Sequence, residues 1–150
     1  MKYYIFLLFG IIVLVACEKK NNYSNNELLC ELMYSMIEND QKYRVIEPMT
    51  DSLWKLQSEI DDYNCETLIE IVKQRGWPHK DRFNCEKHTG GSQIFRHADS
   101  RYFEQIEVLI MKEYKAGRMV AGDYNFIKNH LEGRPAISMD ELLKEPIIEE

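Results

Sequence analysis

The residues of this chain that are best suited to acid/base chemistry gather around His97. A histidine exchanges a proton near neutral pH, and a neighbouring carboxylate or amide can orient its ring. Asp99 and Gln105 follow His97 closely in the sequence. We therefore consider His97, Asp99 and Gln105 as candidate catalytic residues, with His97 as the acid/base and the other two orienting it. The alternative is that Asp99 caps the next helix and that His97 hydrogen-bonds buried backbone from a half-exposed face.

Three other residues are candidates for ligand binding, namely Trp77, Asp40 and Arg44. Trp77, followed by Pro78, could stack on a ligand, although a tryptophan directly after a helix end is typical of a core side chain. Asp40 and Arg44 stand four residues apart on a predicted helix and could form an exposed ion pair. Buried together with Gln41, they would form a polar network in which every group needs a partner. A structural role is the favoured interpretation of all three.

A metal site is a further option, because Cys85-x-x-His88, with His79 before it and His97 after it, supplies side chains that zinc accepts. Structural zinc sites usually pair two tight motifs, and this chain has one. No phosphate-binding loop, nucleophile elbow or HExxH motif occurs either. We therefore expect no metal and no cofactor.

The cysteines allow a disulfide if the chain folds in an oxidising compartment. The pairing that we consider is Cys65 with Cys85, which would close a loop around Trp77 and restrict the unfolded chain by roughly 3 kcal/mol. Cys30 stands near the start of a predicted amphipathic helix. It is expected to be a small buried hydrophobic residue.

The first seventeen residues resemble the leader of a bacterial lipoprotein. The apolar run from Tyr3 to Ala16 is too short to cross a bilayer core of roughly 30 Å as a helix, but it has the length of a secretory signal. It ends in Leu14-Val15-Ala16-Cys17, which resembles a lipobox, in which the cysteine is acylated and becomes the mature N-terminus. We expect a signal peptide over 1–16, lipidation of Cys17 and a flexible tether over 17–26. An ordinary signal peptide with an incidental cysteine is the alternative.

These features predict a protein held on a membrane of the bacterial cell envelope by its lipid anchor. We favour the periplasmic face of the outer membrane, with surface display as the alternative. The net charge of −6 argues against binding to nucleic acid, which requires a basic face. The expected partners are thus the membrane and another protein.

Apolar residues recur at helical spacing almost throughout the chain, and no strand pattern follows the leader. Ser24-x-x-Glu27 is typical of a capping box and predicts a helix that ends near Tyr43 or Arg44. Glu47-Pro48 then interrupts the helical pattern, because the residue before a proline avoids helical backbone angles.

A second helix is expected to begin at Thr50 or Asp51, and Asn64 is expected to cap a third helix that stops at Gly76. A polar loop covers 77–88. Later helices are expected around 92–98, from Asp99 or Ser100 to Gly117, over 124–131 and from the Ser138-x-x-Glu141 cap onward. The predicted fold class is all-α, an irregular bundle of about six helices in a single domain. This helical domain is placed at 27–144, with an acidic tail at 145–150.

Several short strings carry a resemblance when they are taken in order. They are Asp40-Gln41-x-x-Arg44, Asn64-x-x-x-Leu68-x-x-Ile71, Gly76-Trp77-Pro78, His97-Ala98-Asp99 and Gln105. Their order and spacing resemble an uncharacterised bacterial family, domain of unknown function 6624, whose members carry a D-Q-x-x-R, a GWP and an HAD…Q signature. The resemblance implies an all-helical domain of unsettled biochemistry that is commonly exported or anchored to lipid.

The resemblance covers roughly Glu27 to Pro135, and the chain departs from the family near the end of that range. Asn129 and His130 stand where the family has an acidic–basic pair, and the family's C-terminal Gln-x-Tyr-Gly-Thr-Gln segment is missing after Pro135. Any activity that those elements support in relatives is incomplete here. We therefore expect a binding or interaction protein of the cell envelope, for example one with an immunity-type role. The alternative is a hydrolase or lyase that uses His97 with Asp99 and Gln105.

Overall fold

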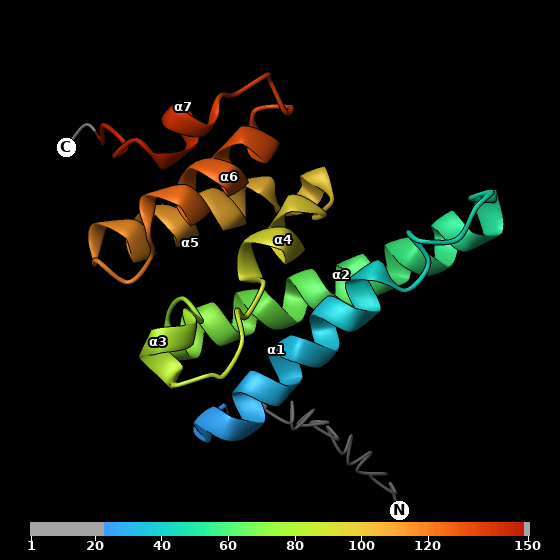
Figure 1. The fold of residues 1–150 in the computed structure, drawn as a ribbon, viewed down its shortest axis with the longest axis horizontal. Helices are drawn as coiled ribbons and strands as arrows, with labels where there is room; N and C mark the ends of the chain where they lie inside the picture. Colours follow the sequence, from blue (N-terminus) through green and yellow to red (C-terminus); the bar gives the residue numbers. More distant parts are fainter. Residues whose placement is uncertain (1–22, 149–150) are drawn as a thin grey trace, which may run out of the picture.

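The computed structural model describes residues 23–148, which form seven α-helices, one short 3₁₀-helix and no strand (Figure 1). The predicted all-α fold is confirmed. The elements are α1 (Asn26–Gln41), α2 (Asp51–Arg75), α3 (Lys80–Phe83), α4 (Gly91–Arg96), η1 (Ser100–Tyr102), α5 (Phe103–Lys115), α6 (Ala121–Leu131) and α7 (Met139–Leu143).

The predicted signal peptide, Cys17 and the first part of the predicted tether lie outside the described residues, as do residues 149 and 150 of the predicted tail. Between residues 23 and 148, no helix combines the length and the apolar character that a membrane crossing requires.

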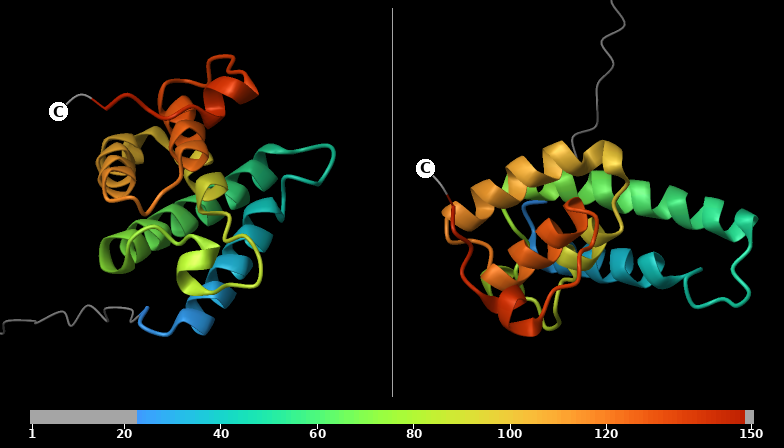
Figure 2. Two further views of the ribbon diagram at one scale, coloured as in Figure 1. Left: turned by 60° about the vertical axis from the view of Figure 1, so that its left-hand side comes forward. Right: turned by 90° about the horizontal axis from the view of Figure 1, so that it is seen from above.

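The first two helices form a long antiparallel hairpin. Asn25 caps α1 by accepting the N–H of Leu28 at 3.1 Å, and Thr50 caps α2 by accepting the N–H of Leu53 at 3.3 Å. These side chains satisfy backbone donors that the first turn of a helix leaves free. The end of the hairpin that joins α1 to α2 projects beyond the other helices (Figures 1 and 2).

The short helix α4 lies between this hairpin and the C-terminal helices. It contacts α1 and α2 on one side and α6 on the other, while α6 also packs against α5 and α7 (Figure 2). The largest side chains that are entirely or almost entirely buried come from α1, α2, α4, α5, α6 and the turn after α2. They include Met33, Met36, Leu68, Ile71, Trp77, Ile94, Phe95, Ile106, Ile110 and Ile127. Because α4 is central to this core, polar residues on its surface are held at the junction between the two groups of helices.

The prediction that Asn64 begins a helix was wrong. Asn64 lies buried inside the continuous helix α2, where its Nδ2 donates to the carbonyl oxygen of Met36 at 3.0 Å. No glycine or proline stands between Asp51 and Arg75, so nothing in that stretch breaks the helix. An asparagine signals a helix start only when its side chain has no better partner, and α1 supplies one here.

The folded part of the chain also begins earlier than predicted. The side chain of Tyr23 is buried against the core, and its carbonyl oxygen accepts a hydrogen bond from Arg75. Asn25, and not Ser24, is the N-cap of α1. The stretch from residue 23 onward therefore belongs to the domain and not to the predicted tether.

The predicted disulfide between Cys65 and Cys85 was wrong, because Cys85 is bonded to Cys30. The Cα atoms of Cys30 and Cys85 lie 5.6 Å apart, where α1 meets the segment after α3. Cys65 is a buried free thiol, and its burial, followed by the charges of Asp62 and Glu66, raises its pKa to about 12. Spacing in the sequence could not decide the pairing, because a disulfide requires two Cα atoms within about 7 Å.

Candidate functional site

The candidate site is an aspartate–histidine pair that joins α1 to α4. The Nδ1 atom of His97 lies 2.8 Å from Oδ1 of Asp40, across 57 residues of sequence. The Asp40 side chain is 1% exposed, whereas 21% of the His97 side chain is exposed. The pair therefore has a buried carboxylate behind an imidazole that reaches the surface.

Two neighbouring helices position this pair. Asp40 stands in the last turn of α1, and His97 is the residue that closes α4. Gln93 lies four residues before His97, so both side chains project from the same face of α4 toward α1. The Nε2 of Gln93 donates to Oδ2 of Asp40 at 3.2 Å, and the Nε2 of Gln41 donates to the same oxygen at 2.5 Å. Both carboxylate oxygens of Asp40 are thereby satisfied.

The electrostatics of the pair keep Asp40 ionised. Burial by itself would raise the pKa of Asp40, but the hydrogen bond and charge of His97, the hydrogen bond from Gln41 and the charge of Arg44 together lower it. An ionised carboxylate only accepts hydrogen bonds, so Nδ1 of His97 must carry the proton between them. The neutral ring is thus fixed in the form whose Nε2 is unprotonated.

A second ring of polar contacts holds Asp40 in place. Arg44 donates to the backbone carbonyl of Asp40 at 2.5 Å and binds both carboxylate oxygens of Asp61 on α2, at 3.0 and 2.7 Å. Gln57 is fully buried and donates to the Asp40 carbonyl and to Asp61, both at 2.9 Å. Asp40 and Arg44, which the sequence offered as a buried network with Gln41, do form one. Their contacts fasten the end of α1 to α2 and orient the carboxylate toward His97.

The chemistry available to this pair is proton transfer at Nε2 of His97. No hydrogen bond from any residue between 23 and 148 reaches that atom in the structure. A histidine that is oriented by a carboxylate at one nitrogen and open at the other is arranged as a general base or general acid.

The structure does not bring His97 together with the two partners that the sequence analysis gave it. Asp99 is exposed, and its Oδ1 accepts the N–H of Arg101 at 3.0 Å, which makes it the cap of η1. Gln105 is exposed on α5. The predicted cluster of His97, Asp99 and Gln105 is therefore replaced by His97 with Asp40, and the alternative interpretation of Asp99 as a cap is confirmed.

Trp77 is a core residue, as the favoured interpretation proposed. Its side chain is 1% exposed, its Nε1 donates to Asp123 at 3.0 Å, and its ring faces Phe95 at 5.9 Å between centroids. A Cβ atom added to Gly91 would come within 3.0 Å of the indole, so the start of α4 packs directly on it. Trp77 therefore helps to fix the position of α4.

The residues considered for zinc are dispersed. Cys85 is consumed by its disulfide with Cys30, and His97 is bonded to Asp40. Within the described residues, no group of three or more His, Cys, Asp or Glu side chains is arranged to hold a metal ion.

Four residues around His97 were missed by the sequence analysis as site residues, namely Gln93, Arg96, His130 and Arg134. The Nε2 of His130 donates to the carbonyl oxygen of Ala98 at 3.0 Å, and its Nδ1 accepts from Nε of Arg134 at 3.0 Å. Burial lowers the pKa of His130 first, and the nearby charges of Arg134 and Arg96 lower it further. The spacing of Gln93 four residues before His97 was the one signal that could have found a member of this group.

Comparisons of the chain with protein-family models, with curated proteins and with solved structures found no match.

Proposed function

We propose that this chain is a lipid-anchored protein of the bacterial cell envelope whose helical domain carries out acid/base chemistry at His97, as a hydrolase or lyase. The observation that carries the proposal is the 2.8 Å contact between His97 Nδ1 and the buried Asp40. This contact orients a histidine that reaches the surface and leaves its Nε2 without a hydrogen bond from the described residues. The two strings that contribute this pair, Asp40-Gln41-x-x-Arg44 and His97-Ala98-Asp99, also belong to the signature of the family that the chain resembles.

The proton path follows from the geometry. Nε2 of His97 accepts a proton from a water molecule or from the substrate, while Nδ1–H stays bonded to Asp40. The same Nε2–H then protonates the leaving group, so the histidine ends in its starting state. The charge of Asp40 faces the imidazolium that exists between these two steps.

The location is proposed from the leader. Leu14-Val15-Ala16-Cys17 ends an apolar run of signal-peptide length, and the Cys30–Cys85 disulfide agrees with an oxidising compartment. Mass spectrometry of the mature N-terminal peptide tests the anchor. We expect an acylated Cys17 at the first position, and an unmodified Cys17 or an uncut leader would contradict the proposal.

The catalytic proposal is tested with the purified mature protein on a panel of ester, phosphoester, amide and glycoside substrates. We expect His97→Gln to lower the activity by about 100-fold or more, which is the usual contribution of a general acid/base. Asp40→Asn should act in the same direction, because an amide can donate to Nδ1 and so move the ring proton to Nε2. His79→Gln is the matched control, since His79 also lies near a carboxylate, that of Asp81, at 3.6 Å.

A second measurement needs no substrate. The ¹⁵N chemical shifts of the ring distinguish the two neutral tautomers of His97. We expect the proton on Nδ1 in the wild type and on Nε2 in Asp40→Asn. A wild-type ring with its proton on Nε2, or an activity that His97→Gln leaves unchanged, would overturn the proposal.

A non-catalytic interaction protein remains the second candidate, because the hairpin of α1 and α2 exposes apolar side chains. Val45, Trp54 and Tyr63 are 73%, 53% and 63% exposed, and Ile46 and Leu56 lie on the same hairpin. Exposed apolar side chains mark a contact surface where they form a contiguous patch. Photo-crosslinking in intact cells from a probe at residue 54, with a probe at the exposed Val108 of α5 as control, tests it. A single protein captured from residue 54 alone would support this candidate, and equal labelling from both positions would contradict it.

A further inference from the structure

Two arginines next to the Asp40–His97 pair have no acidic partner. Neither Arg96 nor Arg134 forms an ion pair with any described residue, whereas Arg44, Arg101 and Arg118 each bind a carboxylate. Arg96 immediately precedes His97, and Arg134 donates from Nη2 to the backbone carbonyl of Arg96 at 2.7 Å. Two positive charges are thus gathered at the end of α4.

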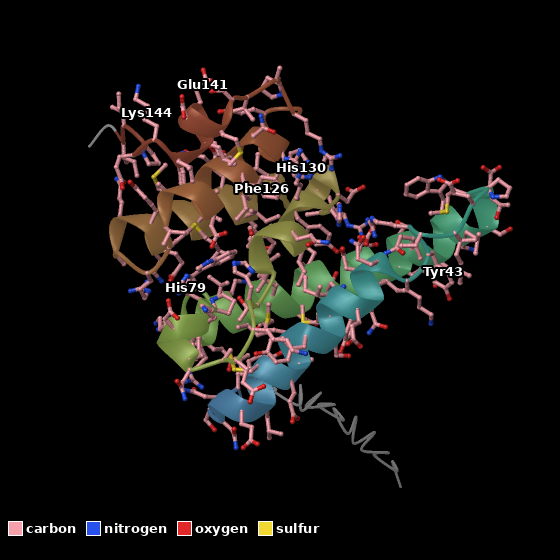
Figure 3. The ribbon with its side chains drawn as sticks, viewed as in Figure 1. Tyr43, His79, Phe126, His130, Glu141 and Lys144 are labelled. Carbon is pink, nitrogen blue, oxygen red and sulfur yellow. A yellow bond between two sulfur atoms is a disulfide. The ribbon has the colours of Figure 1, made fainter. Side chains whose placement is uncertain are left out.

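Neutral groups hold Arg96 in place. Its Nη1 donates to Oδ1 of Asn129 at 3.2 Å and to the carbonyl oxygen of Phe126 at 3.5 Å. Its guanidinium also lies 4.3 Å from the centre of the Phe126 ring. Phe126 and His130 lie on α6 close to α4, and both are labelled in Figure 3. These contacts orient the guanidinium without neutralising its charge, and they leave N–H donors unused.

The backbone turn after α6 brings the side chain of Arg134 to the end of α4. Gly133 and Arg134 have φ angles of 87° and 62°, and the N–H of Arg134 donates to the carbonyl oxygen of Asn129 at 2.8 Å. A left-handed arginine is uncommon, and strained residues of this kind persist where surrounding contacts impose them. Here the reversal lets Nε of Arg134 reach the unprotonated Nδ1 of His130. The fold thus holds two like charges close together with no acid between them.

The burial of Arg96 and the nearby charge of Arg134 both disfavour the charged form of Arg96. Burial lowers the pKa of Arg96, and the charge of Arg134 lowers it further. Like charges at close range repel, so an empty pair of guanidiniums is less favourable than one that shares an anion. Planar guanidinium groups match the oxygens of phosphate or carboxylate with paired hydrogen bonds.

We propose that Arg96 and Arg134 bind a phosphate-type oxyanion beside His97. The binding of the anion stands on the two arginines alone. The assignment of that anion to a substrate, as a phosphate ester or phosphodiester acted on at His97, rests on the proposed function.

The binding is tested first on the unaltered protein. The mature chain is titrated with inorganic phosphate while the Nε–Hε signals of its arginines are followed by NMR, with matched sodium chloride as the ionic-strength control. We expect saturable shifts at Arg96 and Arg134 and at the His97 ring, and none at Arg101, whose charge is paired with Asp62. No shift in the millimolar range, or equal shifts at Arg101, would overturn the proposal.

Variants then assign the site. Arg96→Gln and Arg134→Gln should each weaken phosphate binding by about tenfold or more, since a hydrogen bond to a charged group contributes about 1.5–3 kcal/mol. Arg101→Gln removes one positive charge from η1 and is the matched control, so it should leave the affinity unchanged. Thermal unfolding of each variant shows whether it keeps the wild-type fold.

Two sources could present such an anion, a free phosphate compound or a lipid headgroup. Flotation with vesicles of phosphatidylglycerol, and with phosphatidylcholine as the control, separates them, using the mature chain with Cys17→Ser so that the anchor does not contribute. Retention on phosphatidylglycerol that Arg96→Gln abolishes points to a headgroup. Phosphate binding without such retention points to a soluble compound.

The two proposals fail separately. His97→Gln should still bind phosphate, because neither arginine contacts the ring. If the protein binds phosphate but has no activity that depends on His97, the anion site stands and the proposed function is contradicted. If the protein has such an activity and neither Arg96→Gln nor Arg134→Gln changes it or phosphate binding, the proposed function stands and the anion site is contradicted.

Discussion

The backbone N–H of Trp77 donates to Oε2 of Glu113 at 2.8 Å, and this hydrogen bond joins the turn after α2 to α5. Glu113 is 1% exposed, and Arg118 binds both of its oxygens at 2.6 Å. Hydrogen bonds that involve a charged partner are shorter and stronger than neutral ones. The position of Trp77, and through it that of α4, therefore depends on a buried carboxylate that the sequence analysis did not single out.

Gly76→Ala should strongly destabilise the domain, because this turn has neither the backbone freedom nor the space for a side chain. Gly76 has a φ of 79° and a ψ of −177°, a backbone region that is essentially restricted to glycine. An added Cβ would lie 2.8 Å from Arg82 Nη1, 2.8 Å from Glu113 Oε2 and 2.9 Å from Arg118 Nε. We expect a loss of about 3 kcal/mol in the free energy of unfolding, measured with urea.

Gly117→Ala is the matched control for this prediction. Gly117 has a φ of 66°, and nothing lies within 4 Å of an added Cβ. It should therefore show only the cost of a left-handed alanine, about 1 kcal/mol. Equal losses for the two variants would contradict the steric role of the Gly76 turn.

Stability should fall in acid as Glu113 becomes protonated. Burial alone would raise the pKa of Glu113, but the hydrogen bonds from Arg118 and from the Trp77 backbone, with the charges of Arg118 and Arg82, lower it below its ordinary value of 4.5. A carboxyl whose pKa is lower in the folded state binds fewer protons there than in the unfolded chain. Its contribution is complete above about pH 4.5 and is lost as the pH falls below that value.

The measurement is the free energy of unfolding of the wild type and of Glu113→Gln between pH 7 and pH 3. The variant should be less stable at pH 7 and should depend less on pH below 4.5. Glu59→Gln, at an exposed position on α2, is the control and should follow the wild type. Parallel curves for Glu113→Gln and the wild type would show that Glu113 does not couple folding to protons.

Removal of the disulfide by Cys30→Ser with Cys85→Ser should destabilise the domain by about 4 kcal/mol, because the bond joins residues 55 apart and restricts the unfolded chain. Alkylation followed by mass spectrometry checks the pairing. Apart from Cys17, native protein should not react, denatured protein should take up one label at Cys65, and reduced, denatured protein should take up three. A label on Cys30 in the unreduced, denatured protein would contradict the pairing.

Asp40→Ala should cost about 3 kcal/mol in stability. The substitution leaves Gln93, Gln41 and His97 without their common acceptor and Arg44 with one carboxylate fewer. Glu38→Ala, at an exposed position on the same helix, is the control and should change stability by less than about 0.5 kcal/mol. If Asp40→Ala matched that control, the carboxylate would have no part in holding α4 against α1.

Local patterns were sufficient for several helix ends. The capping box at Ser138 with Glu141, the stop at Gly76 and the cap at Asp99 all occur where the sequence analysis placed them. Each depends on one side chain or one glycine and the backbone next to it, so nearby residues determine it. The error at Asn64 arose in the opposite case, since its hydrogen bond goes to α1 and no local rule contains that partner.

The sequence by itself determined an all-helical domain, its principal caps and stops, and a leader that resembles a lipobox, because periodicity and capping act within a few residues. Tertiary structure alone decided that His97 pairs with Asp40 and not with Asp99, that Cys30 takes Cys85, and that Arg96 and Arg134 meet. Those contacts join residues 57, 55 and 38 positions apart. The packing of the helices against one another decides which distant groups come within about 3 Å. Spacing along the chain does not determine that packing.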